Sequence, residues 1–87
     1  MIIEIYSKDN CPHCVKAKYA AQSFVQETAH TIVEYNMSQN EQYREKLLTE
    51  VPQARSVPQC FVDGKHIGGA DELIEFIEQA NKNILLG

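Results

Sequence analysis

Short β-branched segments alternate with longer segments of helical periodicity along this chain, and their order restricts the folds that it can adopt. Residues 2–6, 31–37 and 57–62 have the length and composition of strands. Asp63-Gly64 is a strong signal for a two-residue hairpin turn, and residues 66–67 follow it as a short partner strand. With a helix after each of the first two strands and one at the end, the predicted order is β-α-β-α-β-β-α.

Three stretches carry the three- to four-residue spacing of helices that bury one face. The first opens at Pro12, a residue favoured at the first helical position, and is expected to end near Thr28. Ser38 and Glu41 form a capping-box pattern that predicts the start of the second, which the next proline ends. Asp71 is the expected N-cap of the third. The predicted buried faces comprise Cys14, Ala17, Ala21, Phe24 and Thr28 in the first helix, Tyr43, Leu47, Leu48 and Val51 in the second, and Leu73, Phe76, Ile77, Ala80 and Ile84 in the third.

These elements predict an α/β domain with a four-stranded mixed sheet flanked by three helices. The two β-α units favour parallel strands, and the hairpin adds an antiparallel one. Right-handed crossovers place helices on both faces of the sheet. A length of 87 residues, of which 44% are hydrophobic, fits one domain spanning residues 1–87 with one ordinary core.

Charge and hydropathy exclude several functions. The formal net charge is −4, and lysines and arginines form no run, which argues against nucleic-acid binding. The apolar runs are far shorter than a membrane span. Glu4 follows the first apolar residues at once, so we see no secretory leader and expect a cytoplasmic protein.

Two of the three cysteines stand in the motif Cys11-Pro12-His13-Cys14, between the first strand and the first helix. Only a thiolate attacks a disulfide, and the N-terminus of a helix favours an anion. Lys8 adds positive charge nearby in the sequence. We therefore expect Cys11 to be the nucleophile. Cys14 lies one turn deeper in the helix, so we expect it to be more buried and to act as the resolving thiol.

Other interpretations of the cysteines remain. The C-x-x-C motif could be half of a zinc site, which would need two more ligands. The candidates are Cys60, His13, His30 and His66, but no second pair of ligands has suitable spacing. A purely structural disulfide would close a tiny loop and constrain little. A C-x-x-C between a strand and a helix in a βαβ pattern favours redox chemistry and no metal. Cys60, on an apolar strand, fits a buried core position, with a regulatory thiol as the alternative.

Three segments together resemble the dithiol class of glutaredoxins. They are the Cys11-Pro12-His13-Cys14 motif, Ser56-Val57-Pro58-Gln59, and the run from Lys65 through Gly68-Gly69 to Leu73. The likeness spans nearly the whole chain. It implies a single, monomeric glutaredoxin domain with a thioredoxin-like fold, and glutathione as the electron donor.

The resemblance also implies a glutathione site. Its residues in this sequence are Lys8, Pro12, His13, Val57, Pro58, Asp71 and Glu72. Val57-Pro58 matches a cis-proline segment whose backbone faces the dithiol, and Asp71-Glu72 matches the segment that holds the γ-glutamyl end. Lys8, with help from Arg55, matches a position for the glycine carboxylate. From the residues alone, a trans proline at an edge strand, an ordinary N-cap and solvated surface charges remain as alternatives.

The implied activity is reduction of protein disulfides and of protein–glutathione mixed disulfides, with ribonucleotide reductase as a family-typical partner. One alternative is a thioredoxin-like carrier fed by a reductase. Another is an iron–sulfur cluster carrier, although Pro12 and Cys14 depart from the usual Cys-Gly-Phe-Ser motif. His13 stands where Tyr is common in dithiol glutaredoxins, and a Cys-Pro-His-Cys motif is similar to that of strongly oxidising disulfide enzymes. We therefore expect a more oxidising dithiol than a Tyr would give.

Overall fold

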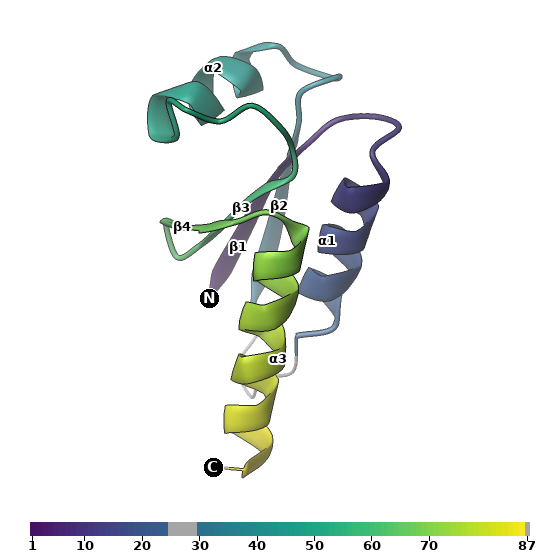
Figure 1. Cartoon of the computed structure of the whole chain (residues 1–87), viewed down its shortest axis with the longest axis vertical. Helices are drawn as coiled ribbons and strands as arrows, with labels where there is room; N and C mark the ends of the chain where they lie inside the picture. The colour runs from purple at the N-terminus through teal and green to yellow at the C-terminus, as the bar shows by residue number, and fades with distance from the viewer. Residues whose placement is uncertain (25–29, 87) are drawn as a thin grey trace.

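The computed structural model describes residues 1–24 and 30–86, with side chains of the last helix described as far as Asn83 (Figure 1). The element order is the predicted one. The elements are β1 (Ile2–Ser7), α1 (Pro12–Gln22), β2 (Thr31–Asn36), α2 (Gln42–Glu50), β3 (Gln59–Val62), β4 (Lys65–Gly68) and α3 (Ala70–Leu86). Within this described part, no helix is both long enough and apolar enough to cross a membrane.

The four strands form one mixed sheet in the order β2-β1-β3-β4. β1 pairs with β2 in parallel, whereas the β1–β3 and β3–β4 pairs are antiparallel. The mixed sheet was expected, but the parallel arrangement expected from the second β-α unit is wrong for β3. The reason is that α2 stays near the carboxyl end of β2 and does not run back along the sheet, so the chain starts β3 from that same end (Figure 1).

The β3–β4 hairpin follows the predicted Asp63-Gly64 turn. Both residues have positive φ angles, 50° and 81°, as a type I′ hairpin turn requires at its two central positions. The turn is also tied to the first strand, because the Ile2 N–H donates to the Asp63 carboxylate at 2.7 Å. This contact fixes the hairpin at the end of the sheet opposite the cysteine motif.

Two apolar layers pack on the sheet, one on each face. α1 and α3 lie side by side over one face (Figure 1). The layer beneath them consists of Ile3, Ile5, Ala17, Ala21, Phe24, Cys60, Val62, Ala70, Leu73 and Ile77. The faces predicted for these helices are confirmed as far as the side chains are described, with Phe76 and Ala80 partly buried; Thr28 and the side chain of Ile84 lie outside the described part.

α2 covers the opposite face near the carboxyl end of β1. Leu47 and Val51 pack there with Met37 and the rings of Tyr6 and Phe61. The predicted face of this helix is right at Leu47 and Val51, and Tyr43 is partly buried against it. It is wrong at Leu48, which is 40% exposed. The row formed by Tyr43, Leu47 and Val51 packs on Tyr6 and Phe61, and Leu48 lies on the neighbouring row, outside this contact.

Two predicted helix boundaries are wrong, and in each case a side chain nearer to the observed end hydrogen-bonds to the backbone there. α1 ends at Gln22, where the Ser23 hydroxyl donates to the Ala20 carbonyl at 2.7 Å. α2 begins at Gln42, whose N–H is accepted by the Asn40 side chain at 3.0 Å. Ser38, predicted to cap α2, instead accepts the backbone N–H of Asp9 at 2.9 Å. Ser38 therefore secures the loop that leads to the cysteine motif.

Candidate active site

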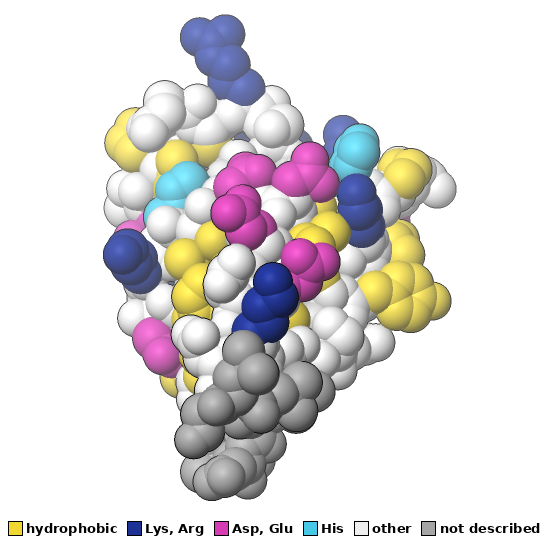
Figure 2. All heavy atoms as spheres, turned by 60° about the horizontal axis from the view of Figure 1, so that its bottom comes forward, with side chains coloured by type: hydrophobic (Ala, Val, Ile, Leu, Met, Phe, Trp, Pro, Cys, Tyr) yellow, Lys and Arg dark blue, Asp and Glu magenta, His cyan; other side chains and the backbone are white. Residues whose placement is uncertain are grey.

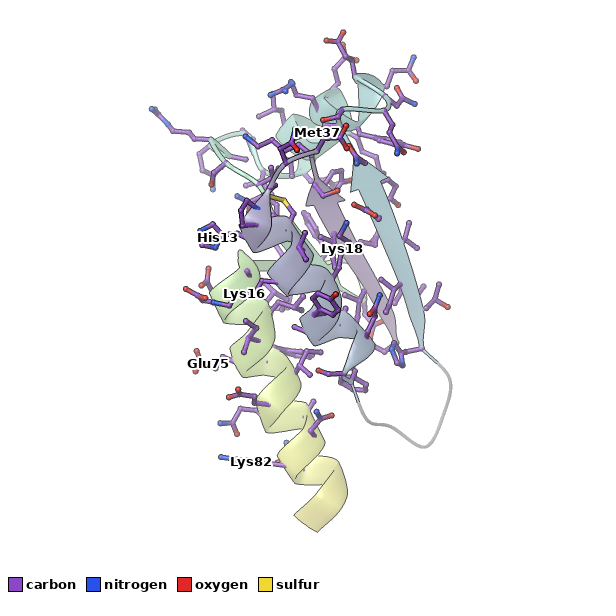
Figure 3. All side chains as sticks on the ribbon, turned by 90° about the vertical axis from the view of Figure 1, so that its right-hand side faces the viewer. His13, Lys16, Lys18, Met37, Glu75 and Lys82 are labelled. Carbon is purple, nitrogen blue, oxygen red and sulfur yellow. A yellow bond between two sulfur atoms is a disulfide. The ribbon has the colours of Figure 1, made fainter. Side chains whose placement is uncertain are left out.

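The cysteine motif lies at the N-terminus of α1, where Cys11 and Cys14 form a disulfide (Figure 3). Cys11 is the N-cap of the helix and has extended backbone angles, while Pro12 holds the first helical position. The Cys14 N–H donates to the Cys11 sulfur at 3.2 Å. Cys11 is 8% exposed and Cys14 is 1% exposed. Solvent and a substrate disulfide can therefore reach Cys11 more easily than Cys14.

A backbone carbonyl from a distant segment faces the same sulfur. The Val57 carbonyl oxygen lies 3.8 Å from Cys11 Sγ, across 46 positions of sequence. The Val57-Pro58 peptide bond is cis, as the resemblance implied. The loop before β3 thus brings extended backbone alongside the dithiol, where an incoming peptide could pair with it.

On one side of Cys11 lies a cavity of about 160 Å³, which we call the cationic cavity. Lys8, Arg44 and Arg55 contribute positive charges to its lining, and Met37 and Leu47 contribute apolar surface. Lys8 and Arg55 were expected here, but Arg44 was not. Its position on an exposed turn of α2 gave no signal in the sequence. The three cations make this cavity suited to a carboxylate.

A second cavity, of about 260 Å³, lies between α1 and the start of α3, and we call it the α3 cavity. His13 lines it from α1, and Pro58, Asp71 and Glu72 line it from the other side. The first N–H groups of a helix lack partners within the helix and favour anions. Val57 lines both this cavity and the cationic cavity, so both adjoin the segment whose carbonyl faces the Cys11 sulfur.

The roles of the two acidic residues at α3 differ from the prediction. Glu72, and not Asp71, caps the helix, because its carboxylate accepts the Gly69 N–H at 2.9 Å. Gly69 holds the N-cap position, since its carbonyl accepts the Leu73 N–H at 3.1 Å. Asp71 lies inside the first turn and pairs with Lys16 at 3.3 Å. This pair is largely exposed and therefore weak, so Asp71 can exchange Lys16 for another cation.

Gly68 makes that cap possible. Its φ angle is +130°, and a Cβ at this position would lie 2.8 Å from the Glu72 carboxylate oxygen. Any larger residue would therefore displace Glu72 from the Gly69 N–H. Exposed acidic side chains continue along α3 through Glu75, and acidic groups gather on this face of the molecule (Figure 2).

A third cavity, of about 590 Å³, lies on the other side of α1, and both cysteines line it. Pro12 faces this cavity and neither of the other two. Lys18 also lines it, and its ammonium pairs with Glu34 of β2 at 3.1 Å. The sequence interpretation missed Lys18, although its position four residues after Cys14 places both on one row of the helix.

The Glu34 carboxylate accepts a hydrogen bond from a buried hydroxyl. Ser7 is 0% exposed at the end of β1, and its hydroxyl donates to the Glu34 carboxylate. This hydrogen bond, followed by the one from Lys18, lowers the pKa of Glu34, while burial acts in the opposite direction. Lys18 and Glu34 therefore form a fixed ion pair beside the dithiol.

The remaining metal-ligand candidates lie away from the dithiol. Cys60 is 0% exposed in β3, and burial, followed by the charge of Glu72, raises the pKa of its thiol to about 12. His30 packs against the ring of Phe24, and His66 against that of Phe61. Among the described residues, no group of three or more metal-ligating side chains comes together.

Comparison with known proteins assigns the family. Residues 3–67 match the Glutaredoxin family model. The chain is 35% identical over 85 residues to Glutaredoxin-C4 of Arabidopsis thaliana, which covers 98% of this chain and 62% of that protein. It is 35% identical over 71 residues to Glutaredoxin 3 of Escherichia coli strain K12, which covers 82% of this chain and 80% of that protein. The chain belongs to the glutaredoxin family, whose members are thiol–disulfide oxidoreductases.

Solved structures agree with this assignment. Oxidized glutaredoxin 2 from Chlamydomonas reinhardtii matches with a TM-score of 0.65 and 31% identity, over 97% of this chain and 78% of that one. A buckwheat glutaredoxin–glutathione complex matches with a TM-score of 0.65 and 26% identity, over 97% of this chain and 76% of that one. The predicted thioredoxin-like glutaredoxin fold is confirmed. The chain spans about three fifths (62%) of the length of two plant glutaredoxins that it matches.

Proposed function

We propose that this protein is a glutathione-dependent thiol–disulfide oxidoreductase that reduces protein disulfides and protein–glutathione mixed disulfides. The observation that carries the proposal is the position of Val57, which lines both the cationic cavity and the α3 cavity and whose carbonyl oxygen lies 3.8 Å from the Cys11 sulfur. A thiol bound beside Val57 would need complementary charged groups on both sides.

Glutathione has that distribution of groups. Its thiol lies in the middle, its glycine carboxylate at one end, and its γ-glutamyl ammonium and carboxylate at the other. Lys8 and Arg55 can take the glycine carboxylate in the cationic cavity. Asp71 can take the ammonium in the α3 cavity, and the unpaired N–H groups of α3 can take the remaining carboxylate. The similarity to a glutaredoxin solved with glutathione supports this arrangement.

The proposed reaction begins with reduced cysteines. The Cys11 thiolate, stabilised by the Cys14 N–H and the helix N-terminus, attacks one sulfur of the substrate disulfide. The substrate bond breaks, a mixed disulfide to Cys11 forms, and the released substrate sulfur takes up a proton. Cys14 then loses its proton and attacks the Cys11 sulfur, which releases the second substrate thiolate and forms the Cys11–Cys14 disulfide.

Two glutathione molecules restore the dithiol. The first, as a thiolate, attacks the Cys11 sulfur and frees Cys14 as a thiol after protonation. The second attacks the sulfur of the bound glutathione, which releases oxidised glutathione and the Cys11 thiolate. The two electrons gained by the substrate thus come from two glutathione thiols.

The test is steady-state turnover coupled either to glutathione and glutathione reductase or to thioredoxin reductase. We expect turnover with glutathione only. Lys8→Gln and Asp71→Asn should each raise the KM for glutathione about three- to tenfold with a smaller change in kcat, because each removes one charged contact. Lys65→Gln, an exposed lysine on β4, is the matched control. Turnover with thioredoxin reductase alone would contradict the proposal.

Cys14→Ser separates the two substrate classes. Glutathione itself can resolve a glutathione mixed disulfide on Cys11, so this variant should keep part of its activity on protein–glutathione mixed disulfides. It should lose reduction of intramolecular protein disulfides, which needs the resolving thiol. Equal loss of both activities would contradict the roles given to Cys11 and Cys14.

A further inference from the structure

The third cavity continues into a groove that the glutathione proposal does not use. The groove has a volume of about 450 Å³ and lies between α1 and β2. Val15 and Lys18 line both the groove and the cavity that contains Cys11 and Cys14. The two hollows therefore adjoin along α1, and together we call them the α1 trough. It starts at the dithiol and leads away from the α3 cavity.

One edge of the trough is an apolar row that begins at the reactive sulfur. Cys11, Val15 and Tyr19 are spaced four residues apart, so they lie on one ridge of the helix. Val15 is 46% exposed and Tyr19 is 69% exposed. Tyr19 is the most exposed large hydrophobic side chain in the described part of the chain. A helix that packed only against its own sheet would have no need of apolar residues on this outward row.

The opposite wall is polar, but its charge is neutralised. Lys18 reaches from α1 toward β2 (Figure 3) and pairs with Glu34, which the Ser7 hydroxyl also holds. Because the cation and the carboxylate are already paired, this wall offers no net charge to a small anion. At the dithiol end, Lys8 and Asp9 add one charge of each sign, so the lining of the trough as a whole has no net charge. A neutral chain with apolar side chains matches such a lining better than a second glutathione does.

We propose that the α1 trough binds an extended segment of the oxidised protein substrate, and that Val15 and Tyr19 select apolar side chains on that segment. This inference rests on the proposed function, since it adds the substrate segment next to the disulfide that Cys11 attacks. The argument for this occupant is continuity, because the trough opens at the two cysteines themselves.

The spacing of the ridge defines the sequence that it would select. Along the helix, Val15 is about 6 Å and Tyr19 about 12 Å beyond Cys11, at 1.5 Å per residue. An extended chain covers about 6.6 Å in two residues and about 13 Å in four, and these residues point to the same side. The preferred substrate therefore has apolar side chains two and four residues from the cysteine under attack.

Single-turnover kinetics can test this without glutathione. The chemically reduced protein would be mixed with peptides whose single cysteine is in mixed disulfide with 2-mercaptoethanol. The in-register pair carries Cys-Gly-Leu-Gly-Leu or its reverse, which places leucine two and four residues from the cysteine. The shifted pair carries Cys-Leu-Gly-Leu-Gly or its reverse. Composition is thus identical and only the register differs. Bis(2-hydroxyethyl) disulfide reports the dithiol alone.

We expect one in-register peptide to be reduced about tenfold faster than the shifted peptides, since two partly buried leucines together contribute on the order of 1.4 kcal/mol. The double variant Val15→Gln and Tyr19→Gln should lose this preference and keep its rate on the small disulfide within about twofold, because glutamine preserves helix propensity. The control is Ile2→Thr, which alters a similarly exposed residue (48%) at the other end of β1 and should keep the preference.

Equal rates for in-register and shifted peptides, or a preference that survives the double substitution, would overturn the inference while leaving the proposed function intact. A wild-type protein that reduces no disulfide, including the small one, would overturn both. Sedimentation velocity supplies the remaining outcome. A wild-type dimer that the double variant abolishes would assign the trough to a second copy of the chain and overturn the inference.

Discussion

Cys60 lies in β3, an inner strand of the sheet, with no exposed surface, whereas Cys11 caps α1 and lines a cavity. The sulfur of Cys60 is packed among apolar side chains, where burial raises the pKa of the thiol to about 12. The sulfur of Cys11 accepts a backbone N–H and lies next to the unpaired N–H groups of a helix start. The same side chain is therefore kept protonated in one place and supported as an anion in the other.

The difference shows that reactivity here is set by position in the fold. Both cysteines have little exposed surface, so exposure alone does not separate them strongly. What separates them is their surroundings. Backbone N–H donors lie next to the Cys11 sulfur, whereas hydrocarbon surrounds the Cys60 sulfur. Glu72 adds to the contrast, because its charge acts on Cys60 as well as capping α3.

The difference between Cys11 and Cys60 is tested most strongly by removing each thiol in turn. Cys11→Ser should lower turnover with glutathione by more than about 1000-fold, because the nucleophile is gone. Cys60→Ala should leave kcat/KM within about twofold, since Cys60 touches no substrate. Comparable losses in the two variants, measured in the coupled assay, would show that Cys60 takes part in the chemistry.

Alkylation of the fully reduced protein is the next test. With a pKa of about 12 in place of an ordinary 9.0, the Cys60 thiolate is about 1000-fold less populated at neutral pH than that of an ordinary thiol. Iodoacetamide at pH 7 should modify Cys11 and leave Cys60 unmodified for as long as the protein stays folded. Mass spectrometry of the peptides checks this, and the urea-unfolded protein, in which Cys60 should react normally, is the control.

The free energy of unfolding at alkaline pH tests the raised pKa of Cys60 in a second way. The unfolded chain loses the Cys60 proton near the ordinary pKa of 9.0, whereas the folded chain keeps it up to about 12. The stability that this group contributes is therefore complete below pH 9 and is lost as the pH rises toward 12. Urea denaturation of Cys60→Ala should show a weaker fall in the free energy of unfolding over this window. Identical slopes for variant and wild type would contradict the assignment.

A smaller effect is expected at the buried hydroxyl of Ser7. Ser7→Ala removes the main cause of the lowered Glu34 pKa and should cost about 1 kcal/mol of stability at pH 7. A lowered pKa stabilises the fold above the unfolded value of 4.5 and loses that effect as the pH falls, so the variant should show a weaker acid dependence between neutral pH and pH 3. Ser23→Ala, which removes a hydroxyl that bonds a backbone carbonyl and no carboxylate, is the control for the acid dependence in these urea titrations.

The smallest effect concerns His13, which is exposed in the first turn of α1 and lines the α3 cavity. A protonated imidazole there favours the thiolate, and a stabilised thiolate weakens the disulfide relative to the dithiol. His13→Tyr should therefore be less oxidising than the wild type at pH 7. Redox titration against glutathione checks this, and equal potentials for variant and wild type would contradict it.

Local patterns in the chain predicted most of the elements correctly. The stripe at Cys14, Ala17, Ala21 and Phe24 lies on the sheet, and Asp63-Gly64 makes the hairpin. These predictions succeeded because each depends on residues within one or two helical turns. Helix ends failed where a predicted cap bonds elsewhere, as at Ser38, whose hydroxyl accepts the Asp9 N–H and is no longer available to α2.

By itself, the sequence determined that Cys11 and Cys14 share one turn at the start of a helix, because a spacing of three residues is a local constraint. Only the tertiary structure decided what surrounds them. It placed the Val57 carbonyl beside Cys11 from 46 positions away and made Glu72 the cap of α3. It also paired Lys18 of α1 with Glu34 of β2, and both line the groove between these two elements. Such contacts join segments far apart in the chain, and their geometry follows from sheet order and packing rather than from any local pattern.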